Sequence, residues 1–174
     1  MTEITCRCGA TMLDLSGAPI MTASCHCQSC RDAAAQLATL PGAQPVTDAN
    51  GGTPFVIWRK DRVTVTRGAE HLRAHTLREG GTRRAVATCC NSPIYLNFNG
   101  GHWLSLYAAR FDAPPQVEMR TMLMDAEPGT VPEDGIPGAR RQSLRFMLKL
   151  LGAWAATGFR FFKMEPMPRL ELRE

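Results

Sequence analysis

Seven cysteines fall into three short clusters whose spacing suits the binding of metal ions. Thiolate sulfur is one of the ligands that zinc prefers, and four ligands surround zinc as a tetrahedron. A cysteine buried only as a small hydrophobic residue would be expected singly on an apolar strand. An odd number of cysteines also cannot pair off completely as disulfides. The clusters are Cys6-Arg7-Cys8-Gly9, Cys25-His26-Cys27-Gln28-Ser29-Cys30 and Cys89-Cys90-Asn91-Ser92-Pro93.

The first two clusters have the spacing that brings sulfurs to one side of a strand. Residues two apart on a strand share a face, so Cys6 can act with Cys8, and Cys25 with Cys27. Cys30 can return to the second pair across a turn. His26 then points the opposite way, and we expect it outside the metal shell, in the core or in a hydrogen bond, with proton relay beside a thiolate site as the alternative.

The last cluster places two cysteines next to each other. If this segment is extended, Cys89 and Cys90 face opposite sides, so only one of them completes the Cys6/Cys8 site. Cys90 is the preferred ligand because Asn91-Ser92-Pro93 predicts a turn directly after it. Cys89 is left for another role, and burial as a small hydrophobe is an alternative for one member of this pair.

Length and composition predict one soluble domain. The 174 residues are 44% hydrophobic, which is enough for one continuous core. The first residues show no basic start followed by an apolar run, and no stretch approaches the roughly 18 apolar residues of a membrane span. We therefore expect an unexported, cytoplasmic protein, in a reducing compartment that disfavours disulfides.

The formal net charge of +4 comes from basic residues scattered in twos and threes. This pattern favours a solvated surface over a nucleic-acid-binding face, which concentrates cations among aromatic residues. An anionic small ligand is compatible with it.

Short apolar stretches between Gly, Pro and Asp predict a mainly β fold. No helical crossovers separate these stretches, so we expect a closed or sandwiched arrangement without parallel pairing. An alanine-rich stretch, 31–37, predicts a short helical turn, and a Pro/Gly-rich loop follows over 41–54. The expected strands are two within 4–21, then 20–24, 55–58, 62–66, 72–77, 84–88 and 103–108.

One amphipathic helix is predicted over about 139–156. Its apolar face carries Leu144, Leu148, Leu151 and Ala155, and another face carries Arg141, Arg145 and Lys149. Packing on the sheet is the expected fate of the apolar face, and lying on a membrane surface is the alternative. We divide the chain into a zinc-binding β domain, 1–112, and a C-terminal extension, 113–174, packed on the same domain; its segment 113–138 is expected to wrap the surface.

The order of these motifs resembles the glutathione-dependent formaldehyde-activating enzyme family. The resemblance covers about residues 4–107, and its most specific part is Cys25-His26-Cys27-x-x-Cys30-Arg31. The other parts are Cys-x-Cys-Gly at 6–9, an aromatic-aliphatic strand ending in Trp58, and an arginine-bearing strand leading into Cys90 and Ser92-Pro93.

This resemblance implies a zinc-stabilised β-tent fold with two zinc sites. Cys6, Cys8 and Cys90 match ligands of the structural site, and Cys25, Cys27 and Cys30 match the second site. The chain departs from the family at Ala87, where the family has the first cysteine of a late C-x-x-C. The fourth ligand of the structural site is then either Cys89, which requires a bent backbone, or a water.

The resemblance also implies a carbon-sulfur lyase activity like that of S-(hydroxymethyl)glutathione synthase. A glutathione-like thiol would add to a small aldehyde at the site of Cys25, Cys27 and Cys30, whose three sulfurs leave one zinc position open. Arg31 and Arg84 are candidates for binding the carboxylates of the thiol, and solvated surface charge is the alternative role for each. A non-catalytic zinc module that binds a protein or other partner is the competing hypothesis.

Overall fold

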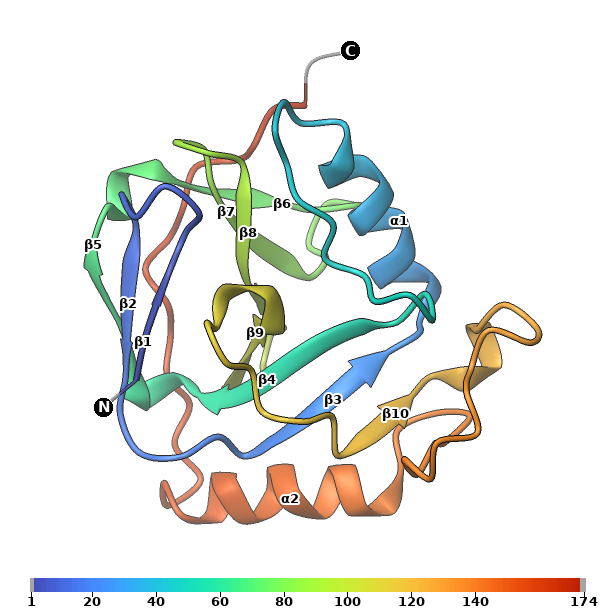
Figure 1. The fold of residues 1–174 in the computed structure, drawn as a ribbon. Helices are drawn as coiled ribbons and strands as arrows, with labels where there is room; N and C mark the ends of the chain where they lie inside the picture. The colour runs from blue at the N-terminus through green and yellow to red at the C-terminus, as the bar shows by residue number, and fades with distance from the viewer. Residues whose placement is uncertain (1, 173–174) are drawn as a thin grey trace.

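A computed structural model describes residues 2–172 and confirms the mainly β prediction, with two sheets and few helices (Figure 1). The smaller sheet has the order β1-β2-β5 and the larger has the order β10-β3-β4-β9-β8-β7-β6. The strands are β1 (Thr2–Thr5), β2 (Met12–Leu15), β3 (Met21–Cys25), β4 (Thr53–Arg59), β5 (Val63–Arg67), β6 (Leu72–His75), β7 (Arg83–Ala87), β8 (Ser92–Asn97), β9 (Trp103–Tyr107) and β10 (Met119–Thr121). The helices are α1 (Gln28–Ala38) and α2 (Leu144–Ala155), with short 3-10 segments η1 (Lys60–Arg62), η2 (Ala69–His71), η3 (Ala108–Arg110) and η4 (Leu123–Asp125).

All the strands predicted from the sequence form, and β8 and β10 form in addition. Proline lacks an N–H for the ladder, so Pro93 obscured β8 in the sequence. β10 has three residues within a Pro/Gly-rich segment and pairs parallel with β3, Met119 lying opposite Ala23. The expectation of no parallel pairing was therefore wrong, because the long excursion between β3 and β10 leaves room for the chain to return in the same direction.

Strand β4 lies at the centre of the molecule and separates two cores. Alternate side chains of a strand face opposite sides. Val56 and Trp58 thus pack in a core with residues of the smaller sheet, whereas Phe55 and Ile57 pack in a second core that includes residues of α1 and α2. Since both faces of β4 are buried, its sequence is an apolar run rather than a strict alternation.

Helix α2 forms inside the predicted range, but its buried face is not the predicted one. Leu144, Leu148 and Leu151 are 74%, 56% and 51% exposed. Leu150 is buried instead, and Phe146 packs partly against the second core. Phe146 and Leu150 lie four residues apart and therefore share one face of the helix. This face packs on the sheet, and the face with the three leucines is turned to solvent.

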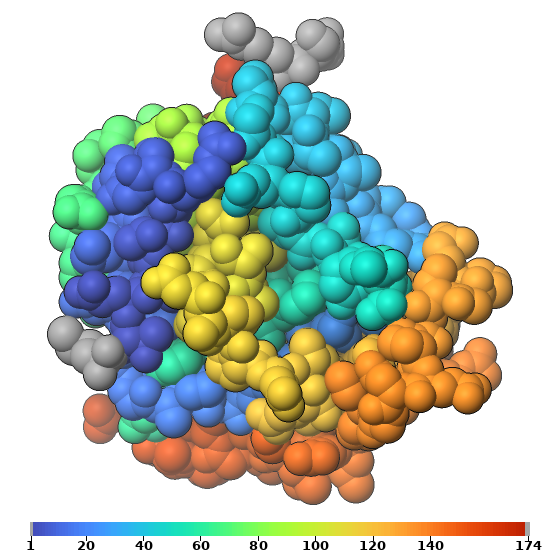
Figure 2. Space-filling view, in the orientation of Figure 1, coloured from blue at the N-terminus to red at the C-terminus, as the bar shows by residue number. Residues whose placement is uncertain are grey.

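The segment after β9 contributes to the larger sheet and to both cores. Part of it fills the space between the N-terminal residues and the loop of residues 41–52, as the yellow atoms show in Figure 2. Further on, Met164 and Met167 pack against the first core, and Arg169 forms a bridge to Ala74 of β6. No helix among residues 2–172 has both the length and the hydropathy that a membrane crossing needs.

Gly68 provides a test of how tightly the smaller sheet packs near the first cysteines. Its φ is +71°, and a Cβ there would lie 2.3 Å from the carbonyl oxygen of Ala10. We expect Gly68→Ala to lower the free energy of unfolding by about 2–4 kcal/mol, because backbone strain and a backbone clash add.

The matched control for this change is Gly129→Ala. Gly129 also has positive φ, +77°, but no atom lies within 4 Å of the added Cβ. Urea denaturation of the two variants separates the clash from the cost of the left-handed conformation. Equal losses in both variants would contradict the close packing at Gly68.

Candidate metal centres

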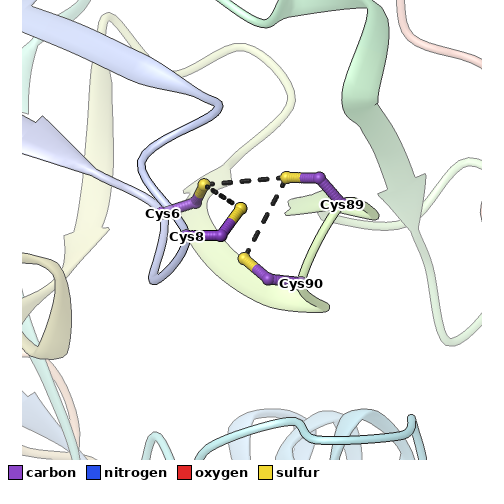
Figure 3. A group of neighbouring side chains, drawn as sticks. All are labelled: Cys6, Cys8, Cys89 and Cys90. Atoms are coloured by element: carbon purple, nitrogen blue, oxygen red, sulfur yellow. Dashed lines mark hydrogen bonds between the residues drawn. The ribbon is translucent and has the colours of Figure 1, made fainter.

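Four cysteine sulfurs converge where the turn between β1 and β2 meets the turn between β7 and β8 (Figure 3). The Sγ atom of Cys6 lies 3.5 Å from that of Cys8 and 3.6 Å from that of Cys89, and the Sγ atoms of Cys89 and Cys90 are 4.0 Å apart. A disulfide would bring sulfurs to about 2.05 Å. The four sulfurs instead surround a common point, as ligands of one metal ion do.

Both cysteines of the last pair lie at this site, so the expectation for an extended segment was wrong and the alternative of Cys89 on a bent backbone agrees with the structure. Residues 88–91 form a turn rather than an extended segment, and Asn91 has a left-handed backbone with φ of 53°. In this turn the side chains of adjacent residues are no longer opposed, so Cys89 and Cys90 point the same way. Cys89 therefore supplies the fourth sulfur in the place that Ala87 leaves without one.

Hydrogen bonds at the four-sulfur site favour the thiolate forms of Cys6 and Cys90, whereas burial and hydrogen bonds to Cys8 and Cys6 raise the pKa of Cys89 to about 12. The backbone N–H of Thr11 donates to the Sγ atom of Cys6 over 3.3 Å, and the Oγ atom of Ser92 lies 3.1 Å from the Sγ atom of Cys90. Burial acts to raise the pKa of Cys90, but the hydrogen bonds from Ser92 and Cys8 outweigh it and lower this pKa to about 6. Ser92 is thus a supporting residue that cysteine spacing alone did not reveal.

The second cluster also brings its sulfurs together. Cys25 ends β3, Cys27 is the N-cap of α1, and Cys30 lies in the first turn of α1. The three sulfurs all lie within 4.8 Å of one another. Within residues 2–172, no fourth His, Cys, Asp or Glu atom joins this group. The predicted set of three cysteines is therefore brought together, without a fourth residue of these types in the described part of the chain.

The three thiols of this group compete for ionisation. Hydrogen bonds from Cys25 and then Cys30 lower the pKa of Cys27 to about 2, whereas the bond to Cys27 raises the pKa of Cys25 to about 11. Hydrogen bonds to the other two sulfurs and burial also raise the pKa of Cys30. Three thiolates this close repel one another, so the full set ionises only around a cation. The donor set therefore fits a divalent metal ion.

Arg84 links this group to a cavity of about 290 Å³. Arg84 is 2% exposed, and its NH2 group donates to the backbone oxygen and the Oγ atom of Ser29, both over 3.0 Å. Ser29 lies between the ligands Cys27 and Cys30 in the chain, and the charge of Arg84 helps to lower the pKa of Cys27. Besides Ser29 and Arg84, the cavity lining consists of Asp32, Leu77, Arg78, Gly81 and Thr82.

The structure distinguishes Arg31 from Arg84, which the sequence offered as equal candidates for binding a carboxylate. Arg31 forms an ion pair with Glu127 over 3.1 Å and also bonds to Gln28, at the surface. It does not line the cavity. Arg84 lines it, and its hydrogen bonds to Ser29 place it next to the chain segment that carries Cys27 and Cys30.

His26 lies outside both sulfur groups, as its position on the strand predicted. Its ring is buried, and its Nε2 atom has no hydrogen-bond partner among residues 2–172. Burial lowers its pKa, which keeps the ring neutral.

Fold and sites together define a mainly β protein with two cysteine groups that could hold metal ions. Residues 1–113 match a family described as "Family of unknown function (DUF6151)", and the chain belongs to that family.

A crystal structure of a Rhodobacter sphaeroides protein is similar in fold, with 16% identity and a TM-score of 0.48 over 79% of this chain and 100% of that chain. A comparison with curated proteins gives no match.

Proposed function

We propose that both cysteine groups bind zinc, one ion each. Sulfurs that lie about 2.3 Å from a tetrahedral zinc ion are about 3.8 Å apart, and the distances of 3.5, 3.6 and 4.0 Å in the four-sulfur site bracket that value. A closed site of four sulfurs is typical of structural zinc, whereas three protein ligands are typical of a site that accepts water or substrate. Iron in both sites of the purified protein would contradict the assignment.

We further propose that the protein is a zinc-dependent enzyme of the carbon-sulfur lyase type, which adds a thiol such as glutathione to a small aldehyde. The observation that carries this proposal is the three-sulfur group of Cys25, Cys27 and Cys30, which has no fourth His, Cys, Asp or Glu ligand within residues 2–172. The group is connected through Ser29, which lies between Cys27 and Cys30 in the chain, to a cavity that Ser29 and Arg84 line. The resemblance of residues 4–107 to the glutathione-dependent formaldehyde-activating enzymes points to the same reaction.

The proposed reaction forms one carbon-sulfur bond. Zinc, when bound, supplies a Lewis acid that favours the ionised form of a thiol or polarises a carbonyl. The thiolate sulfur adds to the carbonyl carbon, the C=O π electrons move to oxygen, and that oxygen takes up the proton that the thiol released. The reverse reaction breaks the same bond, and neither direction needs an oxidant or a reductant.

The protein's own side chains bind and orient the thiol. Glutathione carries carboxylates at both ends and an ammonium group. Arg78 and Arg84 line the cavity as candidates for a carboxylate, and Asp32 lines it as a candidate for the ammonium group. Since Arg84 is fixed to Ser29, it is held in place before the ligand arrives.

The assay that tests this function compares wild-type protein with Cys27→Ser. With formaldehyde and glutathione, we expect the zinc-loaded wild type to accelerate adduct formation above the uncatalysed rate, as followed by NMR. Cys27→Ser should lose that acceleration and fall from two zinc ions per chain to one, because a hydroxyl replaces one of three sulfurs. Circular dichroism should show that the variant keeps the fold.

A fully zinc-loaded wild type that accelerates no addition with several small thiols would remove the lyase proposal. The four-sulfur site would then favour the second candidate, a non-catalytic zinc module for a protein or other partner, since a closed site stiffens a scaffold without any reaction.

A further inference from the structure

A second cavity, of about 430 Å³, lies apart from both cysteine groups. We call it the tail cavity because residues after Phe161 form one of its walls. It has the size of a small-molecule site and shares no lining residue with the cavity beside Arg84. Its lining is Lys60, Arg83, Asn97, Phe98, Asn99, Gly100, Gly101, Phe161, Phe162, Lys163, Met164 and Pro166.

The charged residues of the tail cavity are all cations. Lys60, Arg83 and Lys163 line it, and no acidic residue does. Within the part of the chain that the structure describes, none of the three forms an ion pair. Lys60 is only 7% exposed, and its Nζ atom donates to the backbone oxygen of Gly101. Buried cations in proteins are normally paired, so the buried ammonium group of Lys60 lacks a counter-anion.

Polar atoms of the cavity lining also lack partners. The Oδ1 atom of Asn97 and the Nε atom of Arg83 are buried and form no hydrogen bond within residues 2–172. Asn97 is 3% exposed. Buried polar groups are satisfied in the great majority of cases, and an amide can present either of its ends to a partner. Two residues of the cavity lining thus carry buried polar atoms without a partner, although these atoms are not themselves exposed to the cavity.

The remaining wall is apolar and partly open to solvent. Phe98 and Phe161 are 50% and 60% exposed, although each packs on a tryptophan. The ring of Phe98 stacks on Trp103 at 6.0 Å between centroids, and that of Phe161 lies 4.9 Å from Trp154. Two fixed but exposed rings provide a surface that an apolar ligand body would cover.

We propose that the tail cavity binds a small amphipathic organic anion, with a carboxylate or phosphate head toward Lys60 and Arg83 and an apolar body against Phe98 and Phe161. The cations give the head charge-assisted hydrogen bonds, and the exposed rings give the body its contact. The wall from Phe161 to Pro166 lies outside the family match at residues 1–113, so the site depends on the C-terminal extension.

Isothermal titration of the zinc-loaded full chain tests this proposal with three matched probes: octanoate, octyl phosphate and neutral octanol. We expect saturable binding of at least one anion, with octanol at least about tenfold weaker, because a hydrogen bond to a charged group is lost. Fluorescence of Trp103 and Trp154 gives an independent readout, since both rings contact the cavity wall. Equal binding of octanol, or no saturable binding of any probe, would overturn the proposal.

Variants locate the bound anion. Lys60→Met should weaken anion binding at least about tenfold, because it removes the buried cation. Lys163→Met, at an exposed position, should weaken binding with little effect on folding, and keeps the proposal testable if Lys60→Met does not fold. Arg140→Met, which removes an exposed cation outside the cavity, is the control and should bind as wild type does.

A result in which Lys60→Met and Lys163→Met both fold and bind the anion like wild type would overturn the assignment. Cys27→Ser should bind it unchanged, so the outcome does not depend on the proposed lyase activity.

Discussion

Replacing Cys89 by serine is expected to lower the melting temperature of the zinc-loaded protein by at least about 10 °C. Cys6 and Cys8 follow β1 of the smaller sheet, whereas Cys89 and Cys90 connect β7 and β8 of the larger sheet. A metal ion held by all four sulfurs therefore joins the two sheets across a long loop of chain. Zinc stabilises the folded state because the folded chain binds the ion and the unfolded chain does not. The loss of one sulfur weakens this binding and so reduces the stabilisation.

The control for this prediction is Asn91→Gly in the same turn. Asn91 has positive φ, which glycine adopts freely, and the four sulfurs remain. The change removes one exposed hydrogen bond, from the Nδ2 atom of Asn91 to the backbone oxygen of Pro41. We expect its melting temperature to stay within about 3 °C of wild type, a change of no more than about 1 kcal/mol. Scanning calorimetry with and without a chelator measures both effects. If Cys89→Ser melts like wild type while zinc analysis still gives two ions per chain, Cys89 is not a ligand.

Cysteine spacing predicted both sulfur groups but not the part that each cysteine plays. The pairs at Cys6/Cys8 and Cys25/Cys27 follow from local periodicity, which a short stretch of sequence carries. Whether Cys89 joins depends on a turn at residues 88–91, and no periodic pattern marks a turn of this kind. The expectation of an extended segment was therefore reasonable from the sequence and wrong in the structure.

The buried face of helix α2 also could not be predicted from the sequence alone. Apolar residues occur on two rows of this helix, and the sequence alone gave the leucine row, with Leu144 and Leu148, as the buried face. In the structure the row of Phe146 and Leu150 packs inward. An ion pair between Lys149 and Glu118 lies beside that row and helps to set the rotation of the helix. This contact joins segments far apart in the chain, and periodicity does not report it.

The two candidate arginines were distinguished by burial, which sequence patterns do not give for a charged residue. Arg31 follows the cluster directly in the chain, yet it lies at the surface in an ion pair. Arg84 is more than fifty residues away and reaches Ser29 because β7 places it there. A strand residue that is charged and fully buried departs from the usual pattern, and such departures concentrate at functional sites.

If the proposed addition of glutathione takes place, replacing Arg84 by methionine should raise the KM for glutathione about tenfold to 100-fold, because a buried hydrogen bond to a carboxylate is worth about 1.5–3 kcal/mol. Met keeps most of the side-chain length but removes the charge that helps to lower the pKa of Cys27. Zinc affinity at the three-sulfur group should therefore also fall, which competition with a chelator measures. Arg84→Lys keeps the positive charge but loses the planar guanidinium group, which can bind both oxygens of a carboxylate. This variant should therefore restore the zinc affinity more fully than the KM for glutathione.

Arg31→Met is the matched control for Arg84→Met, since it also removes a guanidinium next to the same cluster. Its partner Glu127 is exposed, and exposed ion pairs contribute little. We expect its KM and zinc affinity to stay within about threefold of wild type. If Arg31→Met and Arg84→Met raised KM equally, glutathione binding would depend on the total positive charge around the cluster rather than on the buried guanidinium group of Arg84.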